Sequence, residues 1–176
     1  MKLTAFLSPS HIHQGVILSS KKRALELIGK IVAEQINQEF KCDKQHELCP
    51  VDCFSNLFKR EKLGSTAINN GVALPHAKLP ANSALLLEKP IAVFLQLEMP
   101  IDYEASDNKE VDLIYAILFP ENSCERYKGA LQDIAQQLSD KNLLKHLRSA
   151  KSAEELWQVL EYADNQQMNN DESEKN

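Results

Sequence analysis

Apolar side chains recur at spacings of three and four in several stretches of the chain, a period that is typical of amphipathic helices. The clearest stretch begins after Ser20, whose hydroxyl is placed to cap a helix, and it ends near Gln38. Its apolar stripe consists of Leu25, Ile28, Val32 and Ile36. The pattern therefore predicts a long helix with one face packed against a core.

The same period predicts four more helices. Their expected ranges are 51–61, 123–138, 141–148 and 153–162. The first follows Pro50, a residue that suits the first turn of a helix. The inward stripe of the second would consist of Tyr127, Leu131, Ile134 and Leu138. Ser152, three positions before Glu155, is typical of a capping box and marks the start of the last helix.

Two runs, residues 91–97 and 111–119, are almost continuously apolar, and their length suits buried strands. Residues 63–80 contain small side chains, two prolines and the turn signal Asn70-Gly71, which together predict turns and short extended pieces. Helices around buried strands indicate an α/β fold. Because some strands are linked by turns and others by helices, we expect a single domain with a mixed β-sheet flanked by helices.

The apolar pattern stops after Tyr162, so the predicted domain spans residues 1–162. Residues 163–176 carry four acids and one lysine and lack the apolar side chains that a core requires. This segment is predicted to be a disordered acidic tail.

Composition narrows the class of protein. The 176 residues are 43% hydrophobic, enough for a core, and the net charge of -5 gives no basic excess for binding nucleic acid. The longest apolar runs are strand-sized, far below the roughly 20 residues that cross a bilayer, so no membrane insertion is expected. The N-terminus lacks the features of a secretory signal, and a cytoplasmic protein is therefore predicted.

His76 is the histidine with a distinctive setting. It follows an apolar approach that ends in Pro75, whose ring fixes the backbone and presents the imidazole at the end of a stiff, extended piece. A neutral imidazole has a free lone pair near neutral pH and suits phosphoryl acceptance. The other histidines, His11, His13, His46 and His146, have ordinary surroundings.

A phosphorylated histidine needs groups that neutralise its charge, and the segment before His76 offers them. Arg60 can pair with phosphate oxygens through two N–H groups. Gly64, Ser65 and Thr66 can offer backbone N–H groups and hydroxyls in a tight loop. Taken alone, Arg60 could equally be a solvated cation at the end of a helix.

Three cysteines surround a histidine between the first two predicted helices. Cys42, His46, Cys49 and Cys53 carry soft sulfur and imidazole ligands, so a zinc or iron site is one alternative. Their spacing matches none of the common zinc patterns. The other alternative is a polar loop that leads into a helix, with Cys53 as a small core residue.

The runs of residues 60–66 and 70–78 together resemble the active-site signature of the type 2 enzyme IIA domains of the phosphoenolpyruvate-dependent phosphotransferase system, the fructose/mannitol family. Stretches at residues 20–26, 107–113 and 153–157 fit as well. The resemblance covers about residues 3–162 and is strongest to the nitrogen-regulatory members of the family.

The resemblance implies a mixed sheet flanked by helices and a phosphoryl group accepted on His76 from a small HPr/NPr-like phosphocarrier protein. It implies that Arg60 lies near the phosphate, that no metal or organic cofactor is needed, and that regulatory target proteins respond to the phosphorylation state. Tyr127 falls at the position where the family usually has a second histidine. A phenol can donate one hydrogen bond but cannot carry positive charge, so phospho-His76 would be less stabilised; alternatively, Tyr127 simply packs on the core.

Three functions fit these residues. The first is a regulatory phosphocarrier, favoured because no membrane or sugar-binding segment is attached. The second is a sugar-specific IIA that passes phosphate to a separate fructose/mannitol-type permease. The third is a binding module that is not phosphorylated, suggested by Tyr127. A hydrolase is a distant fourth, because no serine or cysteine nucleophile motif accompanies His76.

Overall fold

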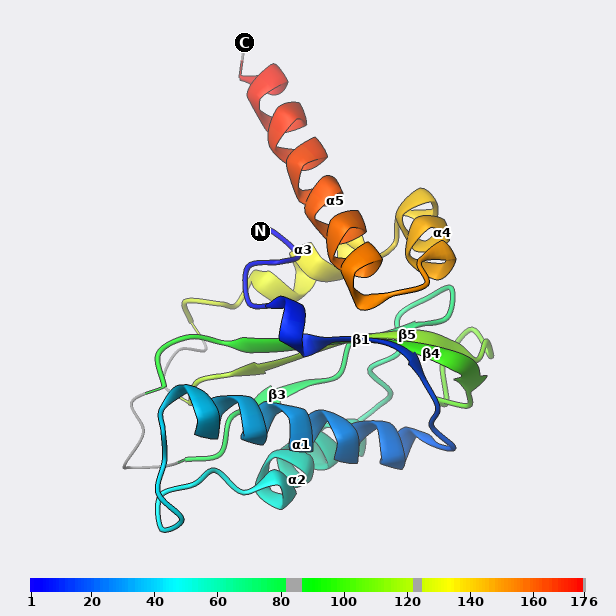
Figure 1. The fold of residues 1–176 in the computed structure, drawn as a ribbon. Coiled ribbons are helices and arrows are strands. Elements are labelled where there is room, and N and C mark those ends of the chain that lie inside the picture. The colour runs from blue at the N-terminus through cyan, green and yellow to red at the C-terminus, as the bar shows by residue number, and fades with distance from the viewer. Residues whose placement is uncertain (82–86, 122–124, 176) are drawn as a thin grey trace.

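A mixed five-stranded sheet lies between two layers of helices in the computed structural model, which describes residues 1–81, 87–121 and 125–175 (Figure 1). The central pair of strands is antiparallel, and the remaining strands run parallel to their neighbours. The strands, in the order β1-β4-β5-β2 with β3 also beside β5, are β1 (Ile12–Val16), β2 (Val72–Ala73), β3 (His76–Lys78), β4 (Ile91–Ile101) and β5 (Val111–Phe119). The predicted α/β fold with a mixed sheet is confirmed.

The layer on one face of the sheet consists of α1 (Lys21–Glu39) and α2 (Pro50–Glu61). The Ser20 hydroxyl accepts a hydrogen bond from the backbone N–H of Arg23 at 3.2 Å, which confirms the predicted cap. The two helices pack closely at Gly29, where a Cβ atom would lie only 2.9 Å from the backbone nitrogen of Phe54. This close packing fixes α2, whose last turn carries Arg60, against α1.

The layer on the other face consists of α3 (Ala130–Gln137), α4 (Lys141–Ser149) and α5 (Ala153–Glu174), together with the N-terminal segment. The predicted cap at Ser152 is present, because its hydroxyl accepts from the backbone N–H of Glu155 at 3.1 Å. The Glu155 carboxylate, however, accepts from the backbone N–H of Lys151 and not from that of Ser152. The capping box is therefore displaced by one residue.

The third helix was predicted over residues 123–138, but α3 begins at Ala130 and residues 125–129 form turns. Residues 122–124, which include the predicted start of that helix, lie outside the described residues. Two features explain the late start. Gly129 occupies the N-cap with no side-chain cap, and the ring of Tyr127 packs against Phe6 and Phe119, with centroids 5.5 and 6.1 Å away.

The last helix was predicted to end at Tyr162, and that end is wrong because α5 continues to Glu174. Leu156, Leu160 and Asp164 follow at four-residue spacing on the buried side of this helix, with a carboxylate in the place of the third apolar side chain. Asp164 is only 3% exposed and thus belongs to the packed domain. Disorder of the residues beyond it stays a prediction.

Asp164 holds the N-terminal segment against α5. Its carboxylate accepts from the backbone N–H groups of Leu3 and Thr4 at 2.6 and 3.1 Å, and from the Thr4 hydroxyl at 2.6 Å. The Tyr115 hydroxyl, on the central strand, donates to the Leu3 carbonyl at 2.7 Å. The start and the end of the domain therefore meet over the middle of the sheet.

We expect Asp164→Ala to lower the free energy of unfolding by roughly 2–3 kcal/mol, because it leaves buried donors without an acceptor. Urea denaturation followed by circular dichroism measures the change. Asp171→Ala, at an exposed position of the same helix, serves as the control and should change stability by less than about 0.5 kcal/mol. Equal losses in the two variants would contradict the role of the Asp164 contacts.

Candidate functional site

His76 is the first residue of β3, on the edge of the sheet beside β5. Pro75 interrupts this edge between β2 and β3, but the backbone on each side is held. The N–H of Leu74 donates to the carbonyl of Thr66 at 2.9 Å, and the carbonyl of Pro75 accepts from the N–H of Ile117 at 3.0 Å. The ring therefore starts from a fixed piece of extended chain, as its sequence predicted.

A main-chain carbonyl sets the tautomer of the His76 ring. Nδ1 lies 2.8 Å from the carbonyl oxygen of Leu74, which can only accept, so Nδ1 carries the proton. The lone pair is then on Nε2, where the Nε–H of Arg60 donates to it at 3.3 Å. Arg60 comes from the last turn of α2, and its guanidinium is also held by the carbonyl of Gly64 at 2.9 Å.

Burial is the main reason why the pKa of His76 lies below its ordinary value, and the Arg60 charge lowers it further. The Leu74 carbonyl and the Glu61 charge act in the opposite direction without cancelling this effect. The ring is therefore mostly neutral at pH 7, and Nε2 carries a lone pair instead of a proton, as a nucleophile requires.

A hollow of about 550 Å³ opens beside His76. Its apolar surface comes from Leu63, Ala77, Phe119 and Leu131, and its cations are Lys59, Arg60, Lys78 and Lys128. Among the described residues that line it, none is acidic. In a chain of net charge -5, this local excess of cations is a site that attracts anions. Sequence reasoning missed the three lysines, although Lys59 adjoins Arg60 and Lys78 lies two positions after His76.

Tyr127 lines the same hollow as His76. Its ring packs on Phe6 and Phe119, so the residue has a core contact and also lies beside the site. The surroundings of Tyr127 therefore include both the core and the hollow beside His76. Its contact with a phosphoryl group stays a prediction.

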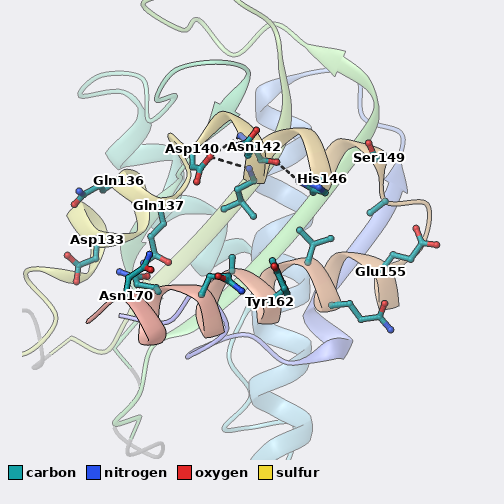
Figure 2. Close-up of a pocket in the computed structure, with 17 residues that line it drawn as sticks. Asp133, Gln136, Gln137, Asp140, Asn142, His146, Ser149, Glu155, Tyr162 and Asn170 are labelled. Atoms are coloured by element: carbon teal, nitrogen blue, oxygen red, sulfur yellow. Dashed lines mark hydrogen bonds between the residues drawn. The ribbon is translucent and has the colours of Figure 1, made fainter. Parts of the chain in front are cut away.

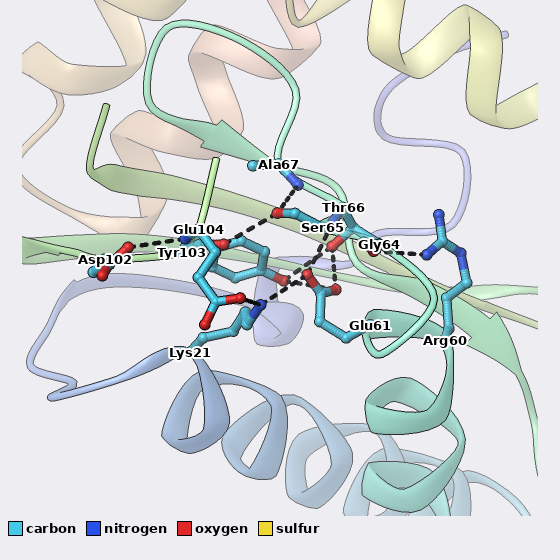
Figure 3. A network of polar contacts seen from close by, with 10 residues as sticks. All are labelled: Lys21, Arg60, Glu61, Gly64, Ser65, Thr66, Ala67, Asp102, Tyr103 and Glu104. Atoms are coloured by element: carbon cyan, nitrogen blue, oxygen red, sulfur yellow. Dashed lines mark hydrogen bonds and ion pairs between the residues drawn. The ribbon is translucent and has the colours of Figure 1, made fainter. Parts of the chain in front are cut away.

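Gly64, Ser65 and Thr66 belong to the turn that follows α2. They are not among the described residues that line the hollow. The Ser65 hydroxyl donates to the carbonyl of Tyr103 at 3.0 Å, and the Thr66 hydroxyl donates to Glu61 at 2.6 Å (Figure 3). These hydroxyls therefore support the turn after α2. That the three residues bind a phosphoryl group directly stays a prediction.

The side chains of the cysteine-rich segment lie in different surroundings. Cys53 is fully buried in the core, and burial raises the pKa of its thiol to about 12. Cys49 is exposed at the start of α2, Cys42 is half-buried, and Nδ1 of His46 lies 2.7 Å from the Asp43 carboxylate. In the part of the chain that the structure describes, no cluster of three or more metal-binding side chains occurs. The geometry gives the metal alternative no support.

A larger hollow, of about 770 Å³, lies between α3, α4 and α5 (Figure 2). Amide residues are frequent among its lining residues, for example Gln136, Asn142 and Asn170. Its histidine, His146, is exposed and has Nδ1 2.6 Å from the carbonyl oxygen of its helix neighbour Asn142. Among the contacts of the described residues, no arginine or lysine side chain donates to this ring.

Residues 5–163 match the family described as phosphoenolpyruvate-dependent sugar phosphotransferase system, EIIA 2. The chain belongs to this family. A nitrogen regulatory protein homolog of Haemophilus influenzae is 52% identical over 164 residues, with 93% of each chain covered. The nitrogen regulatory protein of Escherichia coli K12 is 37% identical over 160 residues, covering 91% of this chain and 90% of the relative.

Solved structures of EIIA 2 proteins have the same fold. The crystal structure of the nitrogen regulatory protein IIA-Ntr from Neisseria meningitidis matches with a TM-score of 0.73 and 32% identity, over 88% of this chain and 96% of that one. The mannitol IIA of Escherichia coli matches with a TM-score of 0.67 over 88% and 98%. At 19% identity, the second likeness concerns the fold alone. None of the described helices is long and apolar enough to span a bilayer.

Nuclear magnetic resonance titration of the ring should place the pKa of His76 below 6.5, with Nδ1 as the protonated nitrogen of the neutral form. Arg60→Gln should raise this pKa, because it removes a neighbouring positive charge, but burial should keep it below 6.5. By linkage, His76 stabilises the fold above pH 6.5, and this contribution is lost as the pH falls from 6.5 towards the lower pKa of the folded state. A His76 pKa above 6.5 would contradict the assignment.

Proposed function

We propose that this EIIA 2 protein accepts a phosphoryl group on Nε2 of His76 from a small HPr/NPr-like phosphocarrier in the cytoplasm, and that its phosphorylation state regulates partner proteins. The observation that carries the proposal is the pair of contacts on one ring: the Leu74 carbonyl at Nδ1 and the Arg60 guanidinium at Nε2. Together they make Nε2 the nucleophile and put a cation where phosphate charge would arrive.

The transfer balances with no cofactor. The lone pair of Nε2 forms the new N–P bond, and the N–P bond of the carrier's phosphohistidine breaks. The electron pair of the broken bond stays on the carrier's ring, which takes up a proton. Phospho-His76 keeps its Nδ1–H on the Leu74 carbonyl, and the proton that the carrier's ring takes up comes from solvent. Positioning and the electrostatics of Arg60 and the neighbouring lysines supply the catalysis.

Regulation follows from the charge that a phosphoryl group adds to this basic surface. A phosphate ester carries about -1.5 to -2 charges at pH 7, and a phosphoryl group on nitrogen is likewise an anion, which would offset the cations around His76. The unmodified surface and the phosphorylated surface would therefore bind different partner proteins. The nitrogen regulatory proteins among the relatives support regulation over sugar transport, which is the alternative in which His76 passes its phosphate to a separate fructose/mannitol-type permease.

Phosphorylation with radioactive phosphoenolpyruvate, the general phosphotransferase enzyme and an HPr/NPr-like carrier tests the proposal. His76→Gln should lose more than 99% of the label, since a carboxamide has no ring lone pair. His146→Gln, which changes an exposed histidine of α4, should be labelled like the wild type. Equal labelling of His76→Gln would sink the proposal, and a wild type that takes no label would favour a binding module that is not phosphorylated.

Tyr127 supplies the second test. Because a phenol carries no positive charge, Tyr127→His should lengthen the lifetime of the phosphorylated protein several-fold, by adding an imidazolium beside the phosphoryl group. Tyr127→Phe keeps the ring contacts with Phe6 and Phe119 and removes only the hydroxyl, so it isolates the effect of that group. The loss of label from the purified phosphorylated protein over time measures the lifetime. Identical lifetimes in all three proteins would show that Tyr127 has only a packing role.

A further inference from the structure

Glu61 is a carboxylate in an unfavourable place. It is the last residue of α2, where the helix dipole disfavours negative charge, and it is only 5% exposed. Burial of an ionised carboxylate costs free energy unless donors surround it. A charged Glu61 side chain therefore costs electrostatic free energy at this position. Its hydrogen bonds and its ion pair indicate its role.

Three segments converge on this carboxylate (Figure 3). Thr66, in the turn after α2, donates its backbone N–H at 2.9 Å and its hydroxyl at 2.6 Å. Lys21, at the start of α1, lies 3.4 Å away and balances the charge. The Tyr103 hydroxyl, from the link between β4 and β5, donates to the Glu61 carboxylate at 3.5 Å and lies 3.0 Å from the Thr66 hydroxyl. Burial and the Glu61 charge raise the pKa of Tyr103, so its phenol stays protonated beside the carboxylate.

The turn that Glu61 closes carries both halves of the proposed phosphoryl site. The carbonyl of Gly64, inside this turn, holds the guanidinium of Arg60 at 2.9 Å. The carbonyl of Thr66, at the end of the turn, holds the N–H of Leu74 at 2.9 Å. Leu74 in turn sets the tautomer of His76. A shift of this turn would therefore move the cation and the nucleophile relative to each other.

We infer that Glu61 is a positioning residue for phosphoryl transfer: its carboxylate fixes the turn of residues 61–66 so that Arg60 stays against Nε2 of His76. This inference rests on the proposed function for its kinetic consequence. Lys21 supports this role, because its ammonium group neutralises the Glu61 carboxylate, which would otherwise repel an incoming phosphoryl group. Neither side chain is among the residues that line the hollow beside His76, so neither is expected to touch the carrier.

Two substitutions of Glu61 separate the effect of side-chain length from the effect of charge. Glu61→Asp keeps the charge but withdraws it by one methylene, so it cannot hold Thr66 in the same geometry. Glu61→Gln keeps the reach and removes the charge. We expect Glu61→Asp to lower kcat for labelling by tenfold or more while the KM for the carrier changes less than threefold. Glu61→Gln should retain more activity than Glu61→Asp, and the control Glu154→Asp, at an exposed site on α5, should match the wild type.

The titration of His76 gives a readout that needs no carrier. In Glu61→Asp the negative charge stays while Arg60 is released, so the pKa of His76 should rise. A folded Glu61→Asp with kcat within twofold of the wild type, or with an unchanged His76 titration, would overturn the inference. If the wild type takes no label, the proposed function fails, but this titration still decides whether Glu61 positions Arg60.

A second pair of variants covers the case in which Glu61→Asp does not fold. Thr66→Val removes the hydroxyl that donates to Glu61, and Thr66→Ser keeps it. Thermal melting first establishes that both are folded. Thr66→Val should then show the same loss of kcat and the same rise in the His76 pKa, and Thr66→Ser should recover most of both. Equal behaviour of the two variants would also overturn the inference.

Discussion

The hydrogen bond from Nδ1 of His76 to the Leu74 carbonyl is the contact on which the chemistry of the site depends. A side-chain partner could rotate away, but this acceptor belongs to the backbone two residues earlier, between β2 and β3. The N–H of Leu74 is itself held by Thr66, and Pro75 stiffens the step between. The orientation and the tautomer of the ring are thus built into the main chain, which leaves the surrounding side chains to supply charge.

Those charges come from elements that are distant in sequence. Lys59 and Arg60 lie in the last turn of α2, Lys78 ends β3, and Lys128 lies before α3. The sheet brings these elements to one edge. The close packing of α1 on α2 fixes the position of α2, and therefore the position of Arg60 relative to His76. Cations at the end of a helix also interact favourably with its dipole, so the phosphate-binding group of the proposed site fits its position in the fold.

Local patterns in the sequence were sufficient for α1, α2, β5 and the two serine caps, because each depends on contacts within a few residues. The candidate pair His76 and Arg60 could also be predicted, and the structure brings them together at 3.3 Å. The start of α3, the length of α5 and strand β1 could not, since each is decided by partners elsewhere in the fold. Glu61 looked like an ordinary helix-end residue in the sequence, and only the convergence of Lys21, Thr66 and Tyr103 shows otherwise.

The contact between Asp164 and the N-terminal segment joins residues that lie 161 positions apart in the chain. A chain that is still being translated cannot make this contact until its last helix leaves the ribosome. The face of the sheet covered by α3, α4 and α5 would therefore close late, whereas α1, α2 and β4 can pack against one another earlier. Contacts of such long range slow folding, because the ends must meet before they gain any stabilisation. The exposed apolar face of the unfinished sheet is where a nascent chain of this family would need protection from aggregation.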